Sequence, residues 1–152
     1  MYRKILVPLD GSPTSACGLD EAMGLARATG ASLVLLHVID AFPLTMDMGS
    51  AHAWDLLIDG MQKHARELLE QAQATAREQG VSTSDRLIEF PALRVADVIV
   101  DEAKTQGCDL IVMGTHGRRG FRHAMMGSDA ERVLRLSPVP VLVVRHPEAR
   151  PA

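Results

Sequence analysis

Glycine and hydroxyl residues in one stretch of this chain have types and spacings that suit an anionic ligand. Residues 114–117 (Gly-Thr-His-Gly) directly follow the apolar run 110–113, and the pair Gly127-Ser128 begins ten residues after Gly117. Glycine has no Cβ, so its backbone can approach a ligand closely and can adopt positive φ values. The N–H groups of such a loop and of a following helix N-terminus attract phosphate. The stretch therefore predicts a phosphate-binding loop, whereas a glycine pair alone would more simply be a turn.

This loop differs from two common nucleotide-binding motifs. The chain contains no Gly-Lys-Ser/Thr sequence, and the glycines at 114, 117 and 120 do not form a G-x-G-x-x-G motif. A P-loop ATPase and a dinucleotide-dependent oxidoreductase are therefore both disfavoured. No Ser/His/Asp or Cys/His set can be assigned from spacing, so we predict no catalytic residue.

Five short apolar runs alternate with helical patterns along the chain. The runs lie at residues 5–7, 33–39, 86–88, 110–113 and 139–144. Near-continuous apolar strands are typical of a parallel sheet that helices cover on both faces. The alternation predicts an α/β fold, a single doubly wound domain over residues 1–146 with a short tail at 147–152. We expect a five-stranded parallel sheet in the order 3-2-1-4-5 with helices on both faces.

Local signals mark where the first and last helices begin and end. Ser12-Pro13 combines a capping residue with a proline at the first helical position, and Gly30 provides a stop. Ser128 is predicted to cap the last helix, with Glu131 three residues later completing a capping box. That helix is expected to stop before Pro138.

The predicted sheet places three segments at one edge. In doubly wound folds, ligands bind outside the carboxyl ends of the strands where the strand order reverses. The first and fourth strands should meet there, so residues 8–10, residues 38–40 and the glycine loop should converge. Asp10 is a candidate to hold a ribose hydroxyl or a metal ion, although it is also suited to capping a turn.

Composition and charge favour a small ligand over a polymer. The chain has 152 residues, 47% of them apolar, and a net charge of −3. Residues 114–135 nevertheless hold five arginines against two carboxylates, which favours a small anion over nucleic acid. No apolar run approaches the ~20 residues of a membrane span. The chain enters a strand directly after Met1, without a signal peptide, so we expect a cytoplasmic protein with neither a nucleic-acid nor a membrane partner.

Taken together, the motifs resemble those of the universal stress protein family, in its ATP-binding branch. The resemblance covers essentially the whole chain and is carried by residues 4–12, 36–40, 112–117, 127–128 and 139–145. The glycine spacing G-x2-G-x9-G-S matches that branch. The resemblance implies ATP as ligand, with Mg²⁺ or Mn²⁺ held through its phosphates. The nucleotide-binding residues that it implies are Pro8, Asp10, Val38, Met113, Gly114, Gly117, Gly127, Ser128 and Asp129.

By this resemblance, Asp10 would lie near the ribose and the backbone of Val38 would contact the adenine. Met113 and Gly114 would flank the ribose, while Gly117, Gly127 and Ser128 would surround the phosphates. Asp129 stands where some relatives have valine, and its negative charge favours the helix dipole but repels phosphate. The exit of the third strand, residues 89–91, also lacks the glycine expected there.

The sequence thus predicts a cytoplasmic ATP-binding protein with a nucleotide-dependent regulatory role in stress. A homodimer through the C-terminal strand, residues 139–145, is expected because Pro140 suits a sheet edge and an apolar edge invites pairing with another chain. The regulatory protein partner is not identified. Two alternatives stay open: a slow ATPase or phosphoryl-transfer enzyme, and a nucleotide-free interaction module.

Overall fold

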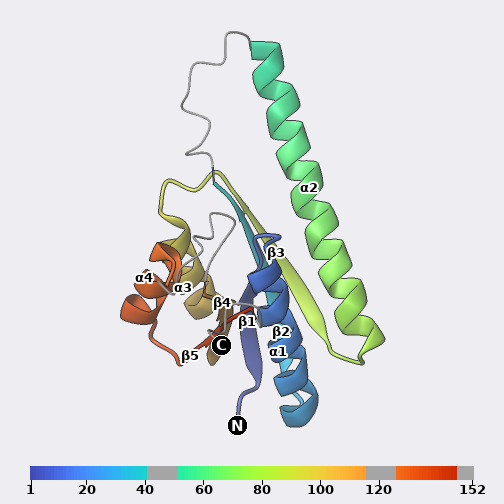
Figure 1. Ribbon diagram of the computed structural model, residues 1–152, viewed down its shortest axis with the longest axis vertical. Helices are drawn as coiled ribbons and strands as arrows, with labels where there is room; N and C mark the ends of the chain where they lie inside the picture. Colours follow the sequence, from blue (N-terminus) through green and yellow to red (C-terminus); the bar gives the residue numbers. More distant parts are fainter. Residues whose placement is uncertain (41–50, 116–125, 147–152) are drawn as a thin grey trace, which may run out of the picture.

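Strands and helices alternate along the chain as the sequence predicts (Figure 1). The computed structural model describes residues 1–40, 51–115 and 126–146. Its strands are β1 (Lys4–Pro8), β2 (Ser32–Ile39), β3 (Thr83–Glu89), β4 (Leu110–Gly114) and β5 (Val141–Val144). Its helices are α1 (Pro13–Thr29), α2 (Ala51–Glu78), α3 (Val95–Thr105) and α4 (Ser128–Leu136). The strands form one parallel sheet in the order β3-β2-β1-β4-β5, which confirms the predicted order.

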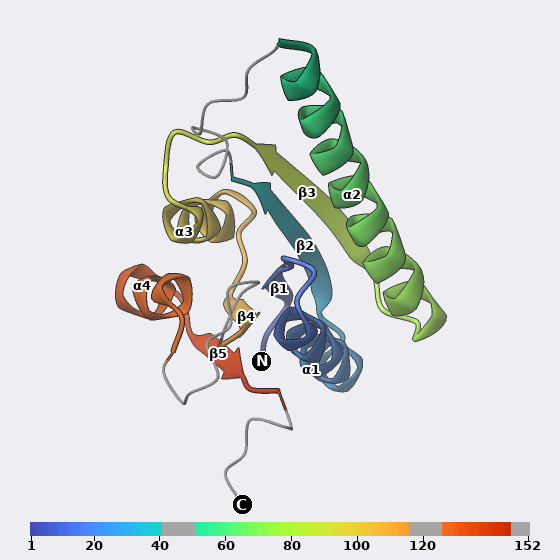
Figure 2. The same ribbon diagram turned by 45° about the horizontal axis from the view of Figure 1, so that its top comes forward.

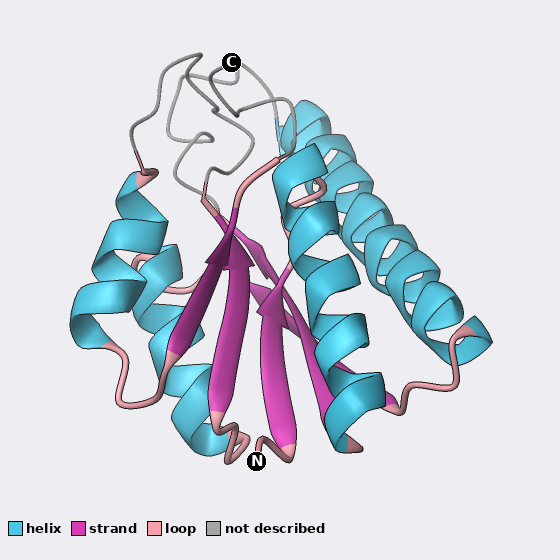
Figure 3. Cartoon of the chain, turned by 60° about the horizontal axis from the view of Figure 1, so that its bottom comes forward, coloured by secondary structure: helices cyan, strands magenta, loops and turns pink. Residues whose placement is uncertain are grey.

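Helices cover both faces of this sheet (Figures 2 and 3). Alternate strand residues point to opposite faces, so Ile5 and Val7 pack with α1 and α2 while Leu6 packs with α3 and α4. All three side chains are fully buried. The core therefore consists of two apolar layers, one on each side of the sheet, as the near-continuous apolar runs predict. No helix within the described ranges is both long enough and apolar enough to cross a membrane.

The two ends of α1 confirm the local signals. The Ser12 hydroxyl accepts a hydrogen bond from the Ser15 N–H at 3.1 Å, and Pro13 is the first helical residue. Gly30 follows the helix with φ 75°, and its N–H bonds to the Ala26 carbonyl. Cap and stop thus depend on residues within one turn of each helix end.

The predicted capping box at α4 is wrong. Gly127, not Ser128, is the N-cap, and it makes no side-chain cap hydrogen bond. The Gly127 N–H donates to the Thr115 carbonyl at 2.8 Å, which holds this residue in extended backbone outside the helix. Ser128 thereby becomes the first helical residue. The Glu131 carboxylate pairs with Arg135 at 2.9 Å.

Two strand boundaries also differ from the prediction. β3 is longer than the predicted residues 86–88. The prediction was too short because the first half of β3 is exposed at the sheet edge, where Ser84 and Asp85 give no apolar signal. β5 begins at Val141 rather than at Val139. Pro140 precedes the strand and contributes only its carbonyl, which accepts the Ile111 N–H at 3.0 Å.

Asp109 ties the start of β4 to the start of β1. Its carboxylate accepts the N–H groups of Arg3 at 2.9 Å and of Lys4 at 3.1 Å, and its own N–H donates to the Lys4 carbonyl. Burial raises the pKa of the Asp109 carboxyl, but the backbone hydrogen bonds from Lys4 and Arg3 together lower that pKa by more than burial raises it. The pKa of this carboxyl therefore lies below its ordinary value.

This lowered pKa predicts a pH-dependent effect of Asp109→Asn. A carboxyl whose pKa is lower in the folded state stabilises the fold above its unfolded-state pKa of about 3.9, and loses that contribution as the pH falls through the folded-state pKa. The difference in free energy of unfolding between parent and variant should therefore be largest near neutral pH and shrink in acid. Urea titrations at about pH 7 and about pH 3 measure it. A difference that does not change with pH would contradict this role.

Candidate functional site

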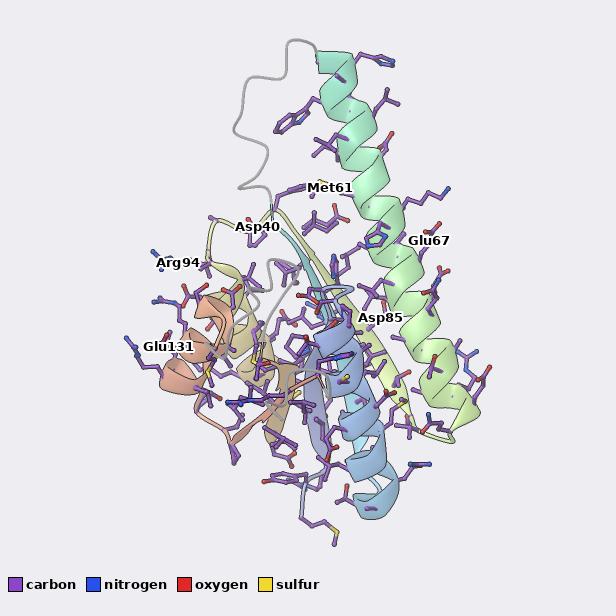
Figure 4. The ribbon with its side chains drawn as sticks, viewed as in Figure 1. Asp40, Met61, Glu67, Asp85, Arg94 and Glu131 are labelled. Carbon is purple, nitrogen blue, oxygen red and sulfur yellow. The ribbon has the colours of Figure 1, made fainter. Side chains whose placement is uncertain are left out.

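The strand order reverses between β1 and β4, whose carboxyl ends lie at the centre of one edge of the sheet. Figure 3 shows the strands pointing together toward this edge. The predicted site residues that the structure describes lie at the carboxyl ends of the strands, on the turn after β1 or at the start of α4: Pro8, Asp10, Val38, Met113, Gly114, Gly127, Ser128 and Asp129. Gly117 lies outside the described residues. Asp40, after β2, and Arg94, before α3, mark the same edge (Figure 4).

Buried Thr115 brings the start of α4 to the end of β4. Its N–H donates to the Val144 carbonyl at 2.9 Å, and its own carbonyl accepts the Gly127 N–H at 2.8 Å. The first N–H to bond within α4 is that of Glu131, to the Gly127 carbonyl at 3.0 Å. The Gly127 N–H is thus occupied, so it is not the group with which this helix would bind the predicted anion.

Asp10 is held in a turn directly after β1. Its Oδ1 accepts the N–H of Ser12 at 2.8 Å, and Gly11 between them has φ 79°. The turn-capping role that the sequence left open is therefore present. The same hydrogen bond fixes the carboxylate at the carboxyl end of β1.

Val38 directs its backbone polar groups over the end of β1. In parallel strands, successive residues turn these groups to opposite sides. The Leu36 carbonyl accepts the Leu9 N–H at 2.7 Å on the β1 side, and the Ile39 carbonyl accepts the Phe90 N–H at 2.9 Å on the β3 side. Val38 therefore faces the β1 side, two residues beyond the pair formed by Leu36 and Pro8. A donor and an acceptor lie there side by side, which complements the acceptor and amino group on an adenine edge.

His37, which was not predicted as a site residue, also lies in this region. The ring is buried, and its Nδ1 lies 2.6 Å from the Leu9 carbonyl, so it links β2 to the residue before Asp10. A polar residue in the middle of the apolar run 33–39 is the signal that could have found it. Buried polar side chains are usually hydrogen-bonded to something that they position.

Gly114 is constrained by the packing of α1. Its φ is not positive, and a Cβ added there would lie 2.8 Å from the carbonyl carbon and 2.9 Å from the oxygen of Thr14. The start of α1 thus occupies the space that a side chain would need. On the helix side, a Cβ at Gly18 would be 3.4 Å from the Gly114 nitrogen. Helix packing therefore demands glycine at this position, and the predicted approach of a ligand to this glycine stays a prediction.

Only two of the five arginines in residues 114–135 lie in the part of the chain that the structure describes. Arg132 pairs with Asp97 at 2.9 Å, and Arg135 pairs with Glu131. Both arginines are thus engaged in ion pairs on α3 and α4, while the other three lie in the range 116–125. Asp129 is exposed in the first turn of α4. Within the described part of the chain, no three His, Cys, Asp or Glu side chains are grouped to hold a metal ion.

Comparison with known proteins identifies the family. A model of the universal stress protein family matches residues 1–145. This chain belongs to that family. The universal stress protein YxiE of Bacillus subtilis is 35% identical over 151 residues, covering 95% of this chain and 100% of its own length.

Solved structures of universal stress proteins share this fold. The structure of protein MJ0577 from Methanocaldococcus jannaschii has a TM-score of 0.83 and 28% identity, covering 96% of this chain and 97% of its own. A universal stress protein from Archaeoglobus fulgidus, in complex with dAMP, has a TM-score of 0.69 and 24% identity, covering 94% and 98%.

Proposed function

We propose that this universal stress protein binds an adenine nucleotide at the carboxyl edge of its sheet. The arrangement of Val38, Asp10 and the start of α4 carries this proposal. It brings a backbone donor and acceptor for a base, a carboxylate for a ribose and a helix N-terminus for phosphate to one edge. The Archaeoglobus fulgidus relative in complex with dAMP supports an adenine nucleotide as the ligand class.

The finer proposal is ATP with Mg²⁺ or Mn²⁺. Pro8 would line the nucleotide crevice, and Met113 and Gly114 would flank the ribose. The residues that would surround the phosphates are Gly117, Gly127 and Ser128. A divalent cation would offset the negative charges of the phosphates and of exposed Asp129. Binding would switch the protein between states that a regulatory protein partner reads in the cytoplasm.

Asp10→Asn tests this proposal without removing the turn. Asparagine keeps the oxygen that accepts the Ser12 N–H but loses the charge that strengthens a hydrogen bond from a ribose hydroxyl. We expect calorimetry with ATP and Mg²⁺ to give about tenfold weaker binding, with an unchanged unfolding midpoint. Asp20→Asn, at an exposed position of α1, is the control for the charge change. A parent that binds neither ATP nor AMP would overturn the proposed function, and unchanged binding by Asp10→Asn would overturn only this residue's role.

We further infer a homodimer through β5. The two outermost strands of the sheet, β3 and β5, differ in the chemistry of their open sides. On β3, the edge carries exposed Asp85 and Glu89, which accept hydrogen bonds from α2 glutamines at 2.8 Å and 2.7 Å. On β5, residues 141–144 are all apolar, and Leu142 is 36% exposed. Charged edges resist pairing and apolar edges favour it, and a two-fold copy of β5 closes without growing into a fibre.

A further inference from the structure

His37 is a buried polar residue in an otherwise apolar part of β2. Its side chain is 7% exposed, and residues 33–36 and 38–39 around it are all apolar. Alternate strand residues share a face, so the ring lies with Leu33 and Leu35 on the face that α1 and α2 cover. Burying a polar ring there costs free energy unless the ring is hydrogen-bonded, so its partner is informative.

The ring bonds to the chain directly after β1. Its Nδ1 lies 2.6 Å from the Leu9 carbonyl oxygen. A carbonyl oxygen can only accept a hydrogen bond, so the Nδ1 of His37 carries the proton and donates it. Leu9 is itself buried, and its N–H donates to the Leu36 carbonyl at 2.7 Å. Two neighbouring residues of β2 therefore hold both backbone polar groups of Leu9.

The carbonyl that His37 holds belongs to the peptide group that leads into Asp10. The N–H of that same peptide group, which is the Asp10 N–H, donates to the Ser15 hydroxyl of α1 at 3.5 Å. A peptide group is planar, so contacts to its carbonyl and to its N–H together set the direction in which the chain enters Asp10. His37 is thus the contact from β2 that orients the backbone from which the Asp10 carboxylate projects.

We propose that His37 is a positioning residue for Asp10 and that it thereby makes the site select nucleotides that carry sugar hydroxyls. This inference rests on the proposed function, in which Asp10 accepts a hydrogen bond from the ribose. Such a bond depends on direction as well as distance, so a carboxylate that is held in place binds more tightly than one that is free to turn. In this role His37 acts through the Leu9 carbonyl and not by contact with the nucleotide.

His37→Asn and His37→Leu form the matched pair that tests this inference. Asparagine and leucine have the same branched shape, but only asparagine has a donor, and that donor is as many bonds from the backbone as the Nδ1 of histidine. By calorimetry with Mg²⁺, His37→Leu should bind ATP about fivefold more weakly than the parent, and His37→Asn within about twofold of it. Circular dichroism checks that each variant is folded.

Dideoxy-ATP separates a positioning role from a merely structural one. This analogue lacks both sugar hydroxyls, so it has no hydrogen bond to Asp10 to lose. His37→Leu should therefore bind dideoxy-ATP within about twofold of the parent. A double substitution gives a second separation. In an Asp10→Asn background, where the charge that His37 positions is gone, His37→Leu should weaken ATP binding by no more than about twofold.

Four outcomes would overturn the inference while leaving the proposed function intact. They are a parent-like His37→Leu, a His37→Asn as weak as His37→Leu, equal losses for ATP and dideoxy-ATP, and an undiminished loss in the Asp10→Asn background. A parent that binds neither ATP nor AMP would instead overturn the proposed function. If His37→Leu does not fold, His37→Phe replaces it, since phenylalanine keeps a ring in the buried space and lacks the donor.

Discussion

Replacing Gly114 by alanine is expected to destabilise the protein by about 3 kcal/mol, the upper end of the usual cost of overpacking. The added Cβ would lie 2.8–2.9 Å from three atoms of Thr14, two of which are backbone atoms that no rotamer change can move. The overlap between this Cβ and Thr14 can be relieved only if the start of α1 moves away from β4. Urea unfolding measures the loss as a lower midpoint with an unchanged slope.

Gly24→Ala is the matched control for this substitution. Gly24 lies inside α1, and a Cβ there would meet no atom within 4 Å outside the backbone of its own helix. Because alanine favours helix over glycine, this variant should be more stable than the parent by about 1 kcal/mol. If Gly114→Ala lowers the free energy of unfolding and Gly24→Ala raises it, the loss at Gly114 is due to the lack of room for a Cβ there. A Gly114→Ala variant as stable as the parent would show that α1 and β4 can separate at no cost.

Removing one hydrogen-bond donor from the open edge of β5 is expected to turn the proposed dimer into a monomer. The carbonyls of Pro140 and Val144 accept the N–H groups of Ile111 in β4 and of Thr115 directly after it, so residues 140, 142 and 144 face inward. Val143, between the inward positions, turns its polar groups to the open edge. Val143→Pro would therefore remove an edge donor and leave the ladder to β4 in place. Light scattering at micromolar concentration should give a dimer for the parent and a monomer for the variant.

A second substitution keeps this prediction testable if proline prevents folding. Leu142→Lys places a charge on the exposed side chain of the same strand, where two-fold pairing would bring like charges together. Leu56→Lys makes the same change at a position that is 61% exposed on α2, away from β5. The first should be monomeric and the second dimeric. A monomeric parent, or a folded and fully dimeric Leu142→Lys, would rule out this interface.

Features that depend on nearby residues were predictable from the sequence. The central strands β1, β2 and β4 are buried on both faces, so their apolar runs show directly in the chain. The cap and stop of α1 depend on Ser12 and Gly30 and their own neighbours. Edge strands were harder to delimit, because β3 mixes exposed polar residues with apolar ones and β5 follows a proline.

The sequence by itself determined the family, the parallel sheet with its order and the edge at which the candidate site residues gather. Only the tertiary structure decided what several of these residues do there. Gly114 is constrained by Thr14, one hundred positions earlier, and Ser128 loses its cap position because Gly127 is bonded to Thr115. Phe90, at the exit of β3 where a glycine was expected, has a φ of 47° and bonds through its N–H to the Ile39 carbonyl of β2. Each of these depends on a contact between segments far apart in the chain, which neither periodicity nor local propensity can encode.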